Sequence, residues 1–86
     1  MPMLNLKLKY FASVREAIGV AGEQTTSNAT TVGALRDELI ARGGAYAQSL
    51  ARNQAIRVAL NQTMCEESTA LSEGDEVAFF PPVTGG

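Results

Sequence analysis

The chain has 86 residues, of which 45% are hydrophobic and 19% charged, a balance typical of one small globular domain. It holds no histidine and one cysteine, which excludes a Ser-His-Asp triad, a Cys-His pair and an iron–sulfur cluster, and we expect no metal site. The net charge of −2 disfavours nucleic-acid binding, and no stretch approaches the roughly 20 apolar residues of a membrane span. We therefore expect a cytoplasmic protein without a catalytic centre of its own.

The N-terminal segment predicts a strand, a short helix and a second strand. Apolar and polar residues alternate over Leu4–Tyr10, the pattern of a half-buried strand with its lysines in water. Phe11–Ile18 has the spacing of a short helical turn, and Gly19 stops it. Glu23–Asn28 is polar and rich in threonine, so we predict a strand at the edge of the sheet.

The main helix is predicted to begin after Thr31, whose hydroxyl can accept the free N–H groups of the first helical turn. Apolar side chains follow at helical spacing, at Val32, Leu35 and Leu39. The polar side chains between them are expected to turn outward, namely Arg36, Asp37 and Glu38. Gly43-Gly44 ends this helix, and Ala45–Arg52 forms either a second short helix or an irregular crossover.

The C-terminal half predicts three more strands, over Ile56–Leu60, Thr63–Cys65 and Glu76–Phe80. In the last strand we expect Val77 and Phe79 to point inward and Phe80 outward. The first and last strands are the most apolar and are expected at the centre. The element order predicts an α+β protein of the β-grasp, or ubiquitin-like, class, with a mixed sheet of about five strands packed on one main helix. Residues 1–80 would form this domain and residues 81–86 an extended tail.

Charge is unevenly distributed along the chain. Residues 61–86 hold five of the nine acidic residues and no lysine or arginine. This acidic half is either an ordinary solvated face or a surface that docks on a basic partner.

The last ten residues carry no charged side chain and end in two glycines. Pro81 and Pro82 favour an extended course away from the domain. Gly85 and Gly86 have no Cβ atom, so nothing crowds the terminal carbonyl carbon. Such a tail can present a carboxylate deep inside the active site of another protein.

Three segments resemble the family of molybdopterin synthase small subunits, the sulfur carriers of molybdenum cofactor biosynthesis. The most specific is the C-terminal string Asp-Glu-Val-Ala-Phe-Phe-Pro-Pro-Val-Thr-Gly-Gly, residues 75–86. The segment Tyr10–Glu16 is similar to the family's Phe-Ala-x-x-Arg-Glu segment, and Leu60-Asn61-Gln62 resembles its exit from the third strand. Length and element order agree with the family along essentially the whole chain.

The resemblance implies a β-grasp carrier without catalytic machinery, active only with the large synthase subunit. An ATP-dependent activating enzyme would adenylate the terminal glycine, and a sulfur donor would convert the adenylate to a thiocarboxylate. The sulfur would then pass to cyclic pyranopterin monophosphate inside the large subunit, in a heterotetramer. The chain itself would bind no cofactor, because ATP is used by the activating enzyme.

The resemblance also assigns roles to individual residues. Gly86 would be the reacting terminus. The residues expected to bind the partner are Gly85, Thr84, Val83, Pro82, Pro81, Phe80, Phe11 and Arg15. From the sequence alone Phe11 is equally consistent with core packing, and Arg15 with a solvated charge. Cys65 is interpreted as a small buried hydrophobe and receives no role.

Three other functions remain open at this stage. A thiamine-thiazole sulfur carrier has the same fold and ending but a different recipient. A ubiquitin-like protein modifier would join Gly86 to lysines. A simple interaction module would not need Gly85 and Gly86 at all.

Overall fold

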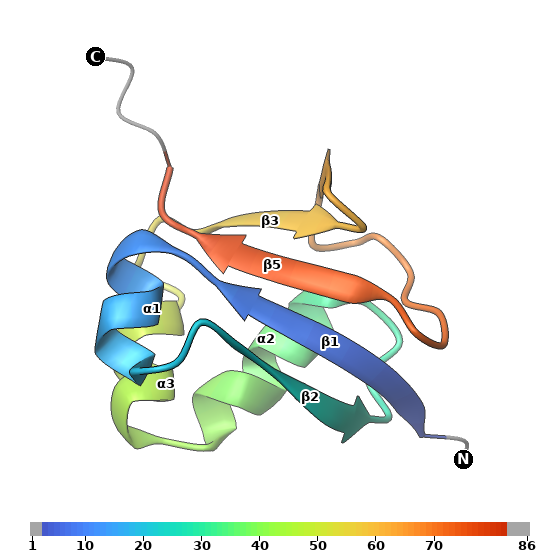
Figure 1. The fold of residues 1–86 in the computed structure, drawn as a ribbon, viewed down its shortest axis with the longest axis horizontal. Coiled ribbons are helices and arrows are strands. Elements are labelled where there is room, and N and C mark those ends of the chain that lie inside the picture. The colour runs from blue at the N-terminus through green and yellow to red at the C-terminus, as the bar shows by residue number, and fades with distance from the viewer. Residues whose placement is uncertain (1–2, 83–86) are drawn as a thin grey trace.

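The computed structural model describes residues 3–82, in which five strands form one mixed sheet and three helices accompany it. The strand order is β2-β1-β5-β3-β4, with β1 and β5 parallel and the other neighbours antiparallel (Figure 1). The elements are β1 (Leu4–Tyr10), α1 (Ala12–Ile18), β2 (Gly22–Ser27), α2 (Val32–Ala41), α3 (Gly44–Leu50), β3 (Arg57–Leu60), β4 (Thr63–Cys65) and β5 (Glu76–Phe80). The predicted β-grasp architecture is confirmed, with the first and last strands adjacent in the middle of the sheet.

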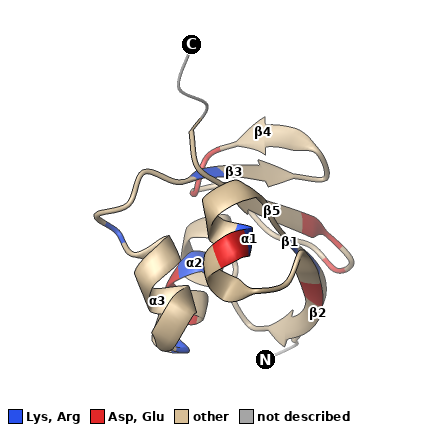
Figure 2. Ribbon diagram, turned by 60° about the vertical axis from the view of Figure 1, so that its left-hand side comes forward, with Lys and Arg blue, Asp and Glu red and all other residues tan. Residues whose placement is uncertain are grey.

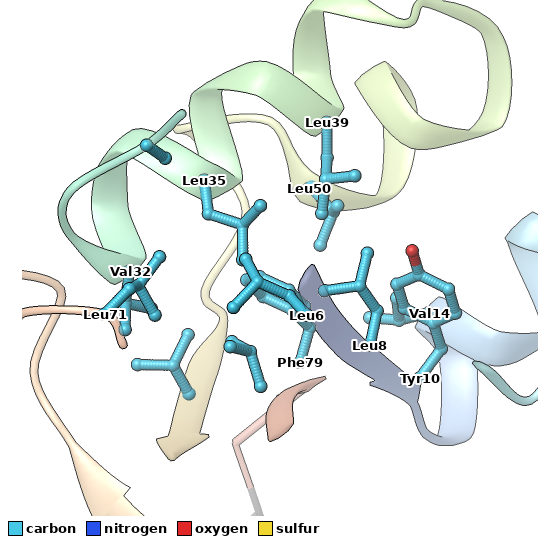
Figure 3. Close-up of a cluster of buried hydrophobic side chains, with 13 residues drawn as sticks. Leu6, Leu8, Tyr10, Val14, Val32, Leu35, Leu39, Leu50, Leu71 and Phe79 are labelled. Carbon is cyan, nitrogen blue, oxygen red and sulfur yellow. The ribbon is translucent and has the colours of Figure 1, made fainter. Parts of the chain in front are cut away.

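The core lies between the sheet and α2, on the face that α2 and α3 cover (Figure 3). From Leu6 onward every second residue of β1 is buried, so the sequence alternation predicted the core face of this strand correctly. The fully buried larger side chains are Leu6, Leu8, Tyr10, Val14, Val32, Leu35, Leu39, Leu50, Val77 and Phe79. We call the opposite face of the sheet the outer face.

The ends of the helices follow the predicted local signals. The Thr31 hydroxyl accepts a hydrogen bond from the Ala34 N–H at 3.2 Å, as expected for an N-cap. After α2, Gly43 has a φ of +79°, a left-handed conformation that glycine adopts without steric cost. Of the two alternatives for the following segment, the structure adopts the short helix.

Arg36 corrects one expectation, because its side chain is buried rather than turned outward. Only 3% of the residue is exposed. Its Nε donates to the Leu50 carbonyl at 2.7 Å, and Nη2 donates to the carbonyls of Ala51 and Gln54 at 2.7 and 3.1 Å. Nη1 pairs with the Glu67 carboxylate at 2.8 Å. The carbonyls at the end of a helix need donors, and the guanidinium of the neighbouring helix supplies them.

A second polar cluster, centred on Glu23, links the edge strand β2 to the helices. The Glu23 carboxylate accepts hydrogen bonds from Tyr10 and Tyr46 at 3.0 and 2.7 Å, and from Arg42 at 2.9 Å. Burial, followed by the hydrogen bond to Glu23, raises the pKa of the Tyr10 hydroxyl far above its ordinary value. Burial alone would raise the pKa of Glu23, but the three donors together hold it below 4.5.

Candidate functional site

The carboxyl end of β5 is where the predicted docking residues begin. Val77 and Phe79 are fully buried, whereas Phe80 is half-buried on the outer face, so the predicted orientations are confirmed. Pro81 and Pro82 follow and are also half-buried. The remaining predicted tail residues lie outside the described part of the chain, namely Val83, Thr84, Gly85 and Gly86.

Phe11 lies beside Phe80 and is 48% exposed, which excludes the core-packing alternative for Phe11. The two rings meet edge to face, with centroids 6.3 Å apart and an angle of 86° between their planes. The Phe11 N–H donates to the Phe79 carbonyl at 3.2 Å, which extends the pairing of β1 with β5 by one residue. Ala12 then turns the chain into α1 with a φ of +51°, in the left-handed region.

Met64 belongs to the same surface, although sequence analysis did not select it. Phe80 and Ala78 share the outer face of β5, and the strand register places Ala78 beside Ala59, and Ala59 beside Met64. Met64 is 55% exposed, whereas the two alanines between Met64 and Phe80 are buried. Since β4 has only three residues, its alternation was too short to show which face Met64 occupies. We name Phe11, Phe80 and Met64 the apolar patch.

Two arginines flank this patch. Arg15 projects from α1 and is exposed, as the solvated alternative for this residue requires. Arg57 of β3 is opposite Phe80 in the strand register and is also exposed. The ion pairs found among residues 3–82 use other arginines, so both guanidinium groups face solvent beside the apolar patch.

Three of the five acidic side chains of residues 61–86 accept hydrogen bonds within the fold, namely Glu67, Glu73 and Asp75. Glu67 pairs with both Arg36 and Arg52; burial alone would raise its pKa, but these two partners hold it below its ordinary value. Glu73 accepts from the backbone and side-chain nitrogens of Asn5 at 2.9 and 2.8 Å, and these bonds lower its pKa. In Figure 2 the acidic loop before β5 lies at the end of the sheet remote from the carboxyl end of β5.

Neither a metal centre nor a spanning helix is found in residues 3–82. No group of three or more His, Cys, Asp or Glu side chains there is arranged to hold a metal ion. In the same range, no helix has the length and apolar character that crossing a membrane requires. Cys65 is half-buried and packs against the core, which agrees with its interpretation as a small hydrophobe.

Known proteins resemble the chain over almost its whole length. The model of the ThiS family matches residues 8–86. The molybdopterin synthase sulfur carrier subunit of Haemophilus influenzae is 42% identical over 81 residues, covering 94% of this chain and 99% of that protein. The protein of the same name from Escherichia coli is 41% identical over 81 residues, with the same coverage of both chains.

Solved structures share the fold of this chain. Small archaeal modifier protein 1 of Haloferax volcanii superposes with a TM-score of 0.76 at 27% identity, covering 93% of this chain and 99% of that one. A chain of the complex of subunits 1 and 2 of the molybdopterin-converting factor from Helicobacter pylori has a TM-score of 0.65 at 24% identity. It covers 96% of this chain and 100% of its own, and this likeness concerns the fold alone. The chain therefore belongs to the ThiS family, and its predicted resemblance to the molybdopterin synthase sulfur carrier subunits is confirmed.

Proposed function

We propose that this chain carries sulfur for molybdopterin synthase on the carboxyl group of Gly86. The observation that carries the proposal is the place where the uncharged C-terminal segment begins. It follows β5, the central strand, at the point where Phe80 and Phe11 form an exposed apolar surface. Relatives at 41 and 42% identity over nearly their full length bear the name of the sulfur carrier subunit, which supports the same role here.

The proposed chemistry begins with activation of the Gly86 carboxylate. A carboxylate resists attack because an oxide would have to leave. Attack of a carboxylate oxygen on the α-phosphorus of ATP gives an acyl-adenylate and releases pyrophosphate. A sulfide-equivalent nucleophile from a sulfur donor then attacks the acyl carbon, and AMP leaves with the former carboxylate oxygen. The product is a thiocarboxylate, whose sulfur is a soft nucleophile.

Transfer would take place inside the large synthase subunit. The thiocarboxylate sulfur attacks an oxygen-bearing carbon of cyclic pyranopterin monophosphate, and a carbon–sulfur bond forms while the carbon–oxygen bond at that carbon breaks and its oxygen leaves. Hydrolysis of the acyl–sulfur bond leaves the sulfur on the pterin and restores the Gly86 carboxylate. Gly85, beside the reacting carbonyl, has no side chain to obstruct the approach.

In this proposal the chain contributes docking and delivery rather than acid–base catalysis. The protein has no histidine, and the partners would supply ATP and every proton-transferring group. Phe11, Phe80 and Met64 would pack on the large subunit while Pro81 and Pro82 direct the tail into it. We infer a heterotetramer in which two carriers flank a dimer of large subunits.

The test is the intact and C-terminal-peptide mass of the protein isolated from its native cells under conditions that prevent hydrolysis. We expect Gly86 to be the terminal residue, and a fraction of the protein to carry one sulfur in place of one oxygen at that residue. Incubation of this fraction with the large subunit and cyclic pyranopterin monophosphate should restore the unmodified mass. A variant extended by one residue beyond Gly86 is the matched control and should stay unmodified. Sulfur loading of the extended variant without prior trimming would refute the mechanism.

A second function is favoured by one observation, the structural likeness to a protein named as a small archaeal modifier. A modifier would join Gly86 to lysine amines of other proteins through an amide bond. The same mass analysis separates the two functions, because conjugation yields branched peptides at Gly86 instead of an oxygen-to-sulfur exchange.

A further inference from the structure

The lysines and arginines of this protein divide into two groups by location. Arg36, Arg42 and Arg52 form ion pairs with acidic side chains. Their partners are Asp37 of α2, Glu23 of the edge strand β2 and Glu67 of the loop after β4. No ion pair within residues 3–82 involves the other four, which are Lys7, Lys9, Arg15 and Arg57. Lys7 and Lys9 are exposed on the outer face of β1, and the two arginines flank the apolar patch. The available positive charge is therefore concentrated on one side of a protein whose net charge is −2.

Three of these cations line one open hollow. It has a volume of about 420 Å³ and lies between β1, β2 and the start of α1. Lys7, Lys9, Arg15 and the half-exposed Phe11 all contribute to its wall. We call it the basic hollow. It shares Phe11 with the apolar patch, so the two surfaces are continuous.

Gly22 helps to keep the hollow open. The strand register places it beside Lys9, where any other residue would project a side chain onto the outer face. A Cβ atom at this position would lie 2.5 Å from the Leu8 carbonyl oxygen, so the close approach of the two backbones requires glycine. The space next to the Lys9 side chain is consequently free for a ligand.

Counting Arg42, which pairs with Glu23, four cations and three acidic groups lie in and around the hollow, an excess of one positive charge. Glu23 lines it, but its carboxylate is held by Tyr10, Tyr46 and Arg42. Glu76 is paired with Lys7 in the strand register, and Glu16 follows Arg15 on α1. Lys9, unlike Lys7, is beside the uncharged Ala78 of β5, so its ammonium group has no carboxylate opposite it in the ladder.

We propose that the basic hollow binds a row of aspartate and glutamate side chains on the surface of the protein that receives the tail. This inference rests on the proposed function and adds the sign of charge that the partner must carry. It also reverses the sequence-based alternative in which the acidic half of the chain docks on a basic partner. Charge complementarity of this kind speeds and orients the encounter of two proteins.

The spacing of the cations favours a protein surface over a small anion. Lys7 and Lys9 are two residues apart on an extended strand, a separation of about 7 Å along β1. Phosphate sites place several donors around one point, often with backbone N–H groups among them. Charges spread along a strand and open to solvent instead match carboxylates spaced along another polypeptide.

The experiment that tests the inference uses the whole protein labelled with ¹⁵N and hexaglutamate as the probe. Titration followed by NMR should shift the backbone amides of β1, Phe11, Arg15 and residues 22–24. The triple variant Lys7→Gln, Lys9→Gln and Arg15→Gln should lose these shifts while its other amide signals stay in place. Asn28→Asp, an exposed site outside the hollow, lowers the net charge by one and should keep them.

Each alternative result would overturn the proposal. Shifts spread evenly over the surface, or unchanged in the triple variant, would show that hexaglutamate does not recognise the hollow. If pyrophosphate produced these shifts and hexaglutamate did not, at the same total concentration of negative charge, the hollow would be assigned to a small anion instead.

Association with the large synthase subunit of the same organism then separates this inference from the proposed function. At low salt we expect the triple variant to associate about tenfold more slowly than the wild type, and the difference to vanish at high salt. Equal rates with equal salt dependence would refute the basic hollow while leaving the carrier function intact. Absence of any binding by the wild type would instead contradict the proposed partner, and the peptide titration would still decide the hollow.

Discussion

Replacing Arg36 with methionine should destabilise the protein strongly without touching the proposed docking surface. Methionine keeps most of the aliphatic volume but removes the guanidinium. The carbonyls of Leu50, Ala51 and Gln54 then lose their arginine donor, and Glu67 loses one of two cationic partners. Breaking a buried charged pair from one side costs about 3–5 kcal/mol. We expect about 3 kcal/mol, because Glu67 is 33% exposed and keeps Arg52.

Urea unfolding followed by circular dichroism measures this loss, and thermal unfolding should show a Tm lower by roughly 15 °C for a domain of this size. Arg57→Met is the matched control, since Arg57 is exposed and has no ion pair among residues 3–82, and it should change stability by less than about 0.5 kcal/mol. Arg36→Lys keeps the charge but not the planar fork and should give an intermediate loss. If Arg36→Met lowered the free energy of unfolding by less than about 1 kcal/mol, the claim that the Arg36 guanidinium stabilises the C-terminal end of α3 would be refuted.

Three further predictions concern docking, pH and backbone strain. Phe80→Ala should weaken binding to the large subunit by roughly 30-fold, as measured by calorimetry, whereas Met3→Ala, which also truncates an exposed side chain, should not; equal affinities would contradict the apolar patch. The pKa of Glu23 is lower in the folded protein than in the unfolded chain. The unfolded chain therefore binds this proton at a higher pH, and the free energy of unfolding should decrease as the pH drops below about 4.5. Glu23→Gln should flatten this acid limb in urea midpoints collected across pH, and an unchanged limb would assign it to other carboxylates. Ala12→Gly should change the free energy of unfolding by less than about 0.5 kcal/mol. Glycine relieves the steric strain of the left-handed conformation at φ +51°, but it also gives the unfolded chain more conformational entropy, and the two effects offset each other. A loss above about 1 kcal/mol would show that the Ala12 methyl group contributes packing of its own.

The elements that the sequence predicted correctly depend on signals carried by neighbouring residues. Alternation over Leu4–Tyr10 and the Thr31 cap act within a few residues, and both are found in the structure. Arg36 was assigned to the wrong environment because helical spacing does not reveal what packs against a helix. Its partners lie 14 to 31 residues away in sequence, in segments with no pattern of their own.

The candidate site shows the same division. Phe80 and Phe11 were selected from the tail and from a family resemblance, but their mutual contact depends on the parallel pairing of β1 with β5. Met64 and Arg57 escaped selection because each belongs to a short strand whose neighbours are set by the sheet order. The pairing of Arg36, Arg42 and Arg52 with acidic side chains likewise depends on tertiary contacts, so the sequence alone did not show which charges are paired.

The central position of β5 has a mechanical consequence. Hydrogen bonds hold this strand to β1 on one side and to β3 on the other, and the tail follows it in the sequence. A pull on the tail loads both ladders in shear, so several bonds must break together before the strand slides. If the tail followed an edge strand instead, a pull on it could break the hydrogen bonds between strands one at a time. A pull on the end of β5 is therefore resisted by both neighbouring strands at once, and we expect the domain to stay folded under it.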